Sequence, residues 1–241
     1  MRSSIKMIFT CALTCFCLAN SYAQTYTRFA VTSSVGMNQM WTAVNPGAGF
    51  SWNNSISFTP HYLFMAEGEL ETGHINGKVL VYGDNSIATT SSFSTSYTYK
   101  GGAAGINLLK VFAPRKRQFR VIPYIYAGVG FLNFHSERFS ENGSLQKTYE
   151  FNTYTTKIGF RLKVKINNQL DWVASFEHNS PQSFYVDASP VPKGYDRFTS
   201  VKFGVSYKIA ATKKRTHIDW NPRVSKKCNA WFDYSGKKNY N

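Results

Sequence analysis

Apolar and polar residues alternate with a period of two along much of the chain. In residues 199–209 (TSVKFGVSYKI), Val201 and Phe203 alternate with Ser200 and Lys202. Successive side chains of an extended strand point to opposite faces, so this period predicts a β-strand with one apolar and one polar face.

Residues 153–166 carry the same pattern in its clearest form. The even positions, such as Ile158 and Phe160, are mostly apolar, and the odd positions include Lys157 and Arg161. The apolar face suits hydrocarbon, whereas the basic face cannot be placed in contact with it.

We expect eight such strands, at residues 26–37, 47–58, 62–74, 96–109, 121–134, 149–166, 169–179 and 198–210. The connections on one side are 59–61, 110–120 and 167–168, and those on the other, mostly longer, are 38–46, 75–95, 135–148 and 180–197. Alternating short turns and long loops are typical of outer-membrane barrels, with the turns in the periplasm and the loops outside the cell. The pattern therefore predicts an all-β fold, an eight-stranded antiparallel transmembrane β-barrel in an up-and-down meander over residues 24–211, with both termini in the periplasm.

The N-terminus predicts export. Arg2 and Lys6 precede the apolar run 7–19, and small residues stand at Ser21 and Ala23. This is the arrangement of a secretory signal peptide over residues 1–23, and the run is too short to span a bilayer as a helix.

Composition narrows the class of protein further. Without Arg2 and Lys6 the chain has 26 basic and 13 acidic residues, and 16% of all residues are aromatic. A basic chain suits anionic surroundings such as lipid headgroups, lipopolysaccharide or peptidoglycan, and export excludes nucleic acid as a partner. An exported, aromatic-rich chain without an apolar helix crosses a membrane only as a closed barrel, which predicts localisation in the outer membrane.

The polar strand faces predict the content of the barrel lumen. An eight-stranded barrel has an interior just wide enough for side chains, so opposite charges meet there at low effective dielectric. We expect a plugged, salt-bridged lumen formed by Glu67, Glu69, Glu71, Asp171, Glu177, Lys157, Arg161, Lys163, Lys165, Lys202 and Lys208. The alternative is a soluble barrel of the lipocalin type, apolar inside and charged outside.

Three segments resemble a known family. PYIYAGVGF (123–131), TTKIGFRLKV (155–164) and DRFTSVKFGVSYKI (196–209) are similar to strands of small outer-membrane β-barrel proteins of the OmpA transmembrane-domain type, especially those of Bacteroidetes-like envelopes. The resemblance covers about residues 26–210 and implies a monomeric barrel with a structural, adhesive or host-contact role in the cell envelope. This sequence departs from OmpA in lacking room for its globular peptidoglycan-binding domain, so we do not expect anchoring through such a domain.

Residues 212–241 lack the alternation and form a basic tail that we place in the periplasm, either as a solvated, partly disordered extension or as an electrostatic tether. As a tether it would contact peptidoglycan, the anionic inner leaflet or a periplasmic protein through basic and aromatic side chains. The expected contact residues are Lys213, Lys214, Arg215, Trp220, Arg223, Lys226, Lys227 and Trp231.

One segment raises an enzymatic alternative. His178 and Ser180 share a strand face near the outer rim, and Asp196 precedes the last strand. This layout resembles the lipid A deacylase family, which implies His178 as general base, Ser180 as nucleophile and Asp196 as the residue that orients the base. That family has Asn after the serine, where this chain has Pro181, so an oxyanion donor is missing.

His61 and His217 lack metal-ligand spacing, while His74, His135 and His178 fall near the predicted extracellular strand ends, where amphipathic side chains suit the interface. No nucleotide-binding motif is present, and we expect no cofactor and no metal. The sequence favours a non-enzymatic outer-membrane barrel for envelope structure or surface contact. The alternatives are the deacylase, a secretion or assembly component that docks a periplasmic partner through its tail, and, less favoured, a small channel.

Overall fold

A computed structural model describes residues 28–41, 45–82, 88–112, 120–183, 185–186, 196–209 and 211. The predicted signal peptide at 1–23 and the predicted tail at 212–241, with its expected contact residues, lie outside these residues. The strands are β1 (Phe29–Met40), β2 (Asn45–Pro46), β3 (Gly49–His61), β4 (Phe64–Tyr82), β5 (Ala88–Asn107), β6 (Val121–Phe139), β7 (Leu145–Lys165), β8 (Leu170–Pro181) and β9 (Phe198–Lys208), with one short helix, α2 (Leu108–Phe112).

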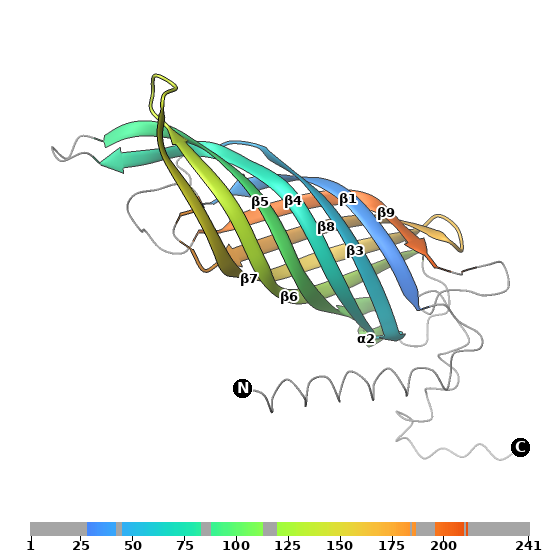
Figure 1. Cartoon of the computed structure of the whole chain (residues 1–241). Coiled ribbons are helices and arrows are strands. Elements are labelled where there is room, and N and C mark those ends of the chain that lie inside the picture. The colour runs from blue at the N-terminus through green and yellow to red at the C-terminus, as the bar shows by residue number, and fades with distance from the viewer. Residues whose placement is uncertain are drawn as a thin grey trace, which may run out of the picture.

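The eight long strands close into a ring (Figure 1). Each pairs antiparallel with its neighbour in sequence, and the ring closes where β1 pairs with β9, with Val35 opposite Phe203. The two-residue strand β2 adds only a short pairing to β4. This confirms the predicted fold class, an eight-stranded antiparallel up-and-down β-barrel of the outer-membrane type.

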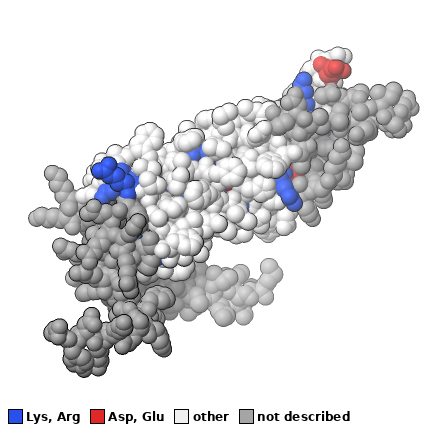
Figure 2. Space-filling model, turned by 180° about the vertical axis from the view of Figure 1, so that it is seen from behind, with Lys and Arg blue, Asp and Glu red and all other residues white. Residues whose placement is uncertain are grey.

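The distribution of side chains is the reverse of that in a soluble barrel. Large apolar side chains such as Met37, Ile158 and Phe203 are exposed on the outside, whereas Lys163 and Lys202 are fully buried. The face shown in Figure 2 carries charged side chains mainly at its two ends, with few in the band between them. The lipocalin-type alternative is therefore wrong for this chain.

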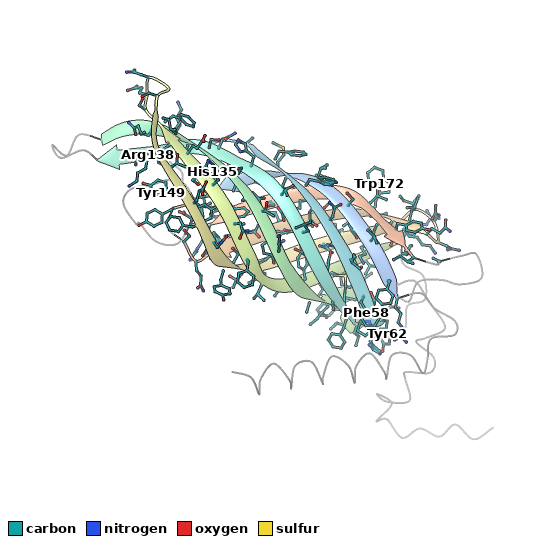
Figure 3. All side chains as sticks on the ribbon, in the orientation of Figure 1. Phe58, Tyr62, His135, Arg138, Tyr149 and Trp172 are labelled. Carbon is teal, nitrogen blue, oxygen red and sulfur yellow. The ribbon has the colours of Figure 1, made fainter. Side chains whose placement is uncertain are left out.

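Aromatic side chains border the apolar band at both ends. Phe29 and Phe58 pack with ring centroids 4.8 Å apart at one end, and Phe131 and Tyr154 with centroids 4.7 Å apart at the other. In Figure 3, Phe58 and Tyr62 lie at the opposite end of the barrel from His135 and Tyr149. Such aromatic girdles are typical of barrels in lipid bilayers.

The two predicted loops at 75–95 and 135–148 are wrong in extent. β4 continues to Tyr82 and β5 begins at Ala88, while β6 continues to Phe139 and β7 begins at Leu145. The loops were predicted from residues such as Ser, Asn and Gly. The inward positions Ile75, Phe93 and Tyr149 are nevertheless buried, and strand pairing continues past the apolar band. Two long hairpins therefore project beyond it.

Among the described residues, no helix combines the length and apolar character needed to span a membrane.

Candidate functional site

The lumen holds a cluster of ionisable side chains contributed by four strands. Inward positions of β4, β7, β8 and β9 bury five acidic and five basic residues: Glu67, Glu69, Glu71, Lys157, Arg161, Lys163, Asp171, Glu177, Lys202 and Lys208. These are all but one of the predicted lumen residues, and they follow from strand parity. The exception, Lys165, is half-buried at the last position of β7.

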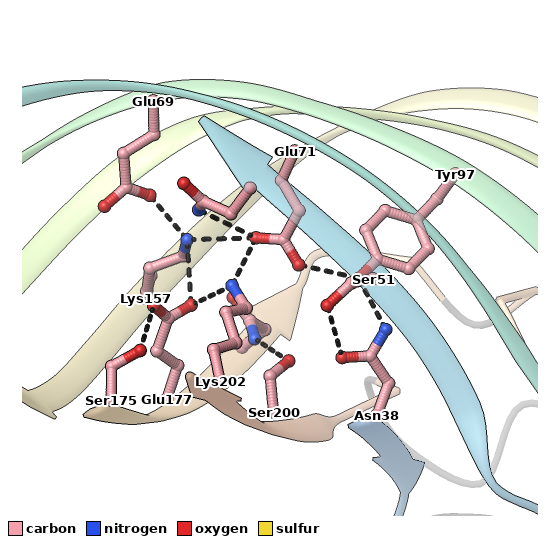
Figure 4. Close-up of polar contacts among 12 residues, drawn as sticks. Asn38, Ser51, Glu69, Glu71, Tyr97, Lys157, Ser175, Glu177, Ser200 and Lys202 are labelled. Atoms are coloured by element: carbon pink, nitrogen blue, oxygen red, sulfur yellow. Dashed lines mark hydrogen bonds and ion pairs between the residues drawn. The ribbon is translucent and has the colours of Figure 1, made fainter. Parts of the chain in front are cut away.

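Two lysines and three glutamates form the centre of the network (Figure 4). Lys157 Nζ lies 2.6 Å from Glu69 Oε2 and 3.0 Å from Glu177 Oε2. Lys202 Nζ lies 2.5 Å from Glu71 Oε2 and 2.6 Å from Glu177 Oε2. Each lysine therefore bridges carboxylates from different strands, which ties β4, β7, β8 and β9 together across the barrel axis.

Tyrosines that were not among the predicted lumen residues complete the network. Tyr97 donates a hydrogen bond to Glu71 Oε1 at 2.8 Å, and Tyr126 donates one to Glu177 Oε1 at 2.7 Å. Lys157 Nζ lies 4.4 Å from the ring centroid of Tyr99. Strand alternation could have identified these tyrosines, because they occupy inward positions of β5 and β6. They were missed because a pattern of apolar and polar residues counts tyrosine as apolar.

Inward glycines make room for these long side chains. A Cβ added at Gly73 would lie 2.6 Å from Cζ of Tyr97, and one at Gly159 would lie 2.5 Å from Cζ of Tyr126. At the closing strand pair, a Cβ on Gly36 would lie 2.5 Å from Cγ of Lys202. Any larger residue would displace the side chains that build the network.

Arg161 and Lys208 extend the ion pairs toward the end of the lumen where β7 and β9 end. Arg161 pairs with Glu67, and its guanidinium carbon lies 4.8 Å from the ring centroid of Tyr126. Lys208 Nζ lies 2.7 Å from Asp171 Oδ1 and donates a second hydrogen bond to the Asn167 carbonyl at 3.1 Å. The charges thus run along the lumen and do not gather at one level.

The opposite end of the lumen is closed by an apolar cap that includes Val186 from the β8–β9 connection. Val186 is fully buried beside side chains such as Phe93 and Phe134. Its carbonyl accepts hydrogen bonds from Thr95 Oγ1 at 2.6 Å and Ser136 Oγ at 2.9 Å. The adjacent Tyr185 stacks on the rings of Tyr149 and Phe151, with centroids 5.2 and 5.4 Å away.

The residues of the deacylase alternative are placed as follows. His178 and Ser180 face outward on β8 and are half-buried, and the His178 ring lies edge-on to Trp41 with centroids 5.8 Å apart. Asp196 is buried, and its Oδ2 accepts a hydrogen bond from the amide of Val186 at 2.7 Å. This hydrogen bond gives Asp196 a structural role in holding the cap.

The outer surface of the projecting strands carries a second polar cluster, around His135 on β6. His135 Nδ1 lies 2.7 Å from Glu150 Oε1 on β7, and Nε2 lies 3.2 Å from Glu137 Oε1. An open groove of about 580 Å³ runs beside it, lined by residues 96–98, 133–135 and 150–152. Among the described residues, no group of three or more His, Cys, Asp and Glu is arranged to hold a metal ion.

The hydrogen bonds to Glu137 and Glu150 raise the pKa of His135 above its usual value. Their contribution to the stability of the β6–β7 hairpin is therefore full below the unfolded pKa of about 6.5 and is lost as pH rises through the folded pKa. An NMR titration of the His135 ring should give a pKa above the ordinary range, and Glu150→Gln should lower it. An ordinary pKa in both proteins would show that these contacts do not form in solution.

No family model and no curated protein matches the chain. Among solved structures, it is similar to a major outer membrane protein from Thermus thermophilus, at 12% identity and a TM-score of 0.47, covering 75% of this chain and 99% of that one. It is also similar to Neisserial surface protein A, at 14% identity and a TM-score of 0.45, covering 75% of this chain and 97% of that one. A third is Ail, the attachment invasion locus protein of Yersinia pestis, at 10% identity and a TM-score of 0.45, covering 76% and 99%. What the chain shares with these outer-membrane proteins is the barrel fold.

Proposed function

We propose that the protein is a non-enzymatic barrel of the outer membrane that contributes to envelope structure or surface contact and forms no open channel. The observation that carries the proposal is the reversed distribution of side chains, with exposed apolar residues around a buried network of five acids and five bases. Exposed apolar strand faces are stable in lipid, where every backbone hydrogen bond of a closed barrel is already made.

The filled lumen supports the absence of a channel. Lys157 and Lys202 cross the axis to carboxylates on other strands, and Val186 closes one end. An ion entering this lumen would have to separate charge pairs that are out of reach of bulk water, which is costly. Wide aqueous pores belong to barrels with many more strands.

The orientation and partners of the barrel follow from the same proposal. β1 begins and β9 ends at the end of the barrel that carries the connections 62–63, 108–120 and 166–169, and the two long hairpins project from the opposite end. In outer-membrane barrels the end that carries both termini faces the periplasm. The projecting hairpins therefore face the outside of the cell. The partners are outer-membrane lipids and lipopolysaccharide around a monomeric barrel, with peptidoglycan or a periplasmic protein contacted by the tail.

The finer relationship to OmpA-type barrels of Bacteroidetes-like envelopes is part of the proposal and rests on the three sequence segments. The deacylase and the assembly component stay predictions from sequence.

Two measurements on purified, refolded protein test this function. Unheated protein should migrate differently from boiled protein on a denaturing gel, because a closed barrel resists detergent. In a planar bilayer it should give no stable conductance steps, with a 16-stranded porin as the positive control. Regular open steps would overturn the filled lumen, and identical gel mobility before and after boiling would overturn the closed barrel.

A further inference from the structure

The outward side chains of four neighbouring strands form rows that change in chemistry with distance from the apolar band. β4, β5, β6 and β7 pair in register, so residues opposite one another form rows that run across the four strands. The first row, at the edge of the band, is Leu70, Lys100, Phe131 and Tyr154; the second is Thr72, Thr98, Asn133 and Asn152; the third is His74, Ser96, His135 and Glu150.

The first row marks the boundary of the apolar band and contains a single charge. Phe131 and Tyr154 pack against each other and are exposed, and Lys100 is exposed directly opposite Phe131. A lysine at this level can keep its stem on apolar surface and direct its ammonium group to the headgroup region. The position suits one phosphate at the top of a lipid.

The second row offers only uncharged hydrogen-bonding groups. Thr98, Asn133 and Asn152 supply hydroxyl and amide groups that both donate and accept, and all three line the groove of about 580 Å³. A ligand that uses such a surface fully has many hydroxyl groups close together, as a saccharide does.

The third row limits where a phosphate can bind. Glu150 and the nearby Glu137 both contact His135, and their carboxylates disfavour an anion at this level. A ligand with one phosphate at Lys100 and hydroxyl groups beyond it satisfies all three rows.

We propose that the outward face of β4–β7 binds the phosphorylated saccharide headgroup of a glycolipid in the outer leaflet. The acyl chains lie along the apolar band, the phosphate pairs with Lys100, and the sugar hydroxyls bond to Thr98, Asn133 and Asn152 in the groove. An ordinary phospholipid satisfies the first row but leaves the groove without a partner. This inference rests on the proposed placement in the outer membrane.

The test compares two exposed lysines of the same sheet. Lys100 lies at the edge of the band, and Lys78 is an exposed lysine on β4 four rows farther from it. Binding to rough-type lipopolysaccharide is measured by native mass spectrometry on full-length protein in detergent. Lys100→Gln should bind about tenfold more weakly, the loss expected for one charge-assisted hydrogen bond, and Lys78→Gln should bind as the wild type does.

The ligand is varied in the same assay. Removing the lipid phosphates should weaken binding to the wild type and leave Lys100→Gln unchanged. The double variant Asn133→Ala, Asn152→Ala should bind both forms of the lipid more weakly than the wild type does. Phosphatidylglycerol should compete poorly with lipopolysaccharide for binding to the wild type. Equal loss with Lys100→Gln and Lys78→Gln, or equal competition by phosphatidylglycerol, would overturn the proposed site.

Gel mobility before and after boiling is recorded for every variant. A Lys100→Gln protein that keeps the mobility shift of a closed barrel but binds the lipid as the wild type does contradicts the glycolipid site alone. Loss of the shift in the wild type contradicts the barrel itself.

Discussion

Replacing Lys202 with methionine should lower the free energy of unfolding by about 3–5 kcal/mol, the cost of removing one partner from a buried ion pair. Lys202 Nζ lies between Glu71 Oε2 at 2.5 Å and Glu177 Oε2 at 2.6 Å. Methionine keeps the length of the side chain but leaves these two carboxylates facing each other with less compensating charge. Urea unfolding of the protein refolded in lipid vesicles measures the change.

Two further variants distinguish the loss of the buried ion pairs from the general effect of removing a lysine. Lys78→Met removes a lysine that is exposed on β4 and should change stability by less than about 0.5 kcal/mol. Adding Glu177→Gln to Lys202→Met removes part of the uncompensated charge and should restore part of the loss. A Lys202→Met protein as stable as Lys78→Met would contradict the buried network.

Placing arginine at Phe160 should cost about 2–4 kcal/mol, whereas arginine at Ile166 should cost no more than about 1 kcal/mol. Both side chains are exposed on the outside of the barrel, Phe160 near the middle of the apolar face of β7 and Ile166 just past its end. A charge at the bilayer midplane is far from water, while one at the interface reaches it. The same unfolding experiment measures both variants.

The depth dependence is the informative result. In a water-soluble barrel both positions would face solvent, and neither arginine would be strongly destabilising. Equally small losses of stability for the two variants would therefore contradict the placement in a membrane. Equally large losses would show that the apolar band extends beyond the end of β7.

Strand parity was sufficient to predict most of the site from sequence. In β7 the odd positions Lys157, Arg161 and Lys163 had to share a face, and a barrel leaves only two faces to choose from. Periodicity gave no information on which charge pairs with which, because that depends on the register between strands that are distant in sequence, such as Lys157 with Glu69 at 2.6 Å. The register is set by pairings around the whole ring.

The ends of the strands were harder to predict than their faces. Residues 75–82 and 88–95 contain Asn, Gly and Ser, which are common in loops, and above a membrane a strand does not need an apolar outer face. The cap was missed for a related reason. Val186 and Asp196 lie on a connection without periodicity, and their contact depends on a chain path that local patterns do not encode.

The pairing of β1 with β9 has a consequence for biogenesis. β1 cannot pair with its second neighbour, β9, until the end of the chain has been synthesised and exported. The two strands form the closing edge, where Val35 lies opposite Phe203. A chain interrupted anywhere before residue 198 would present two unpaired edges, which template aggregation and are not tolerated in hydrocarbon. Completion of the polypeptide therefore has to precede release into the bilayer, and proteolytic fragments of this protein should be cleared and not inserted.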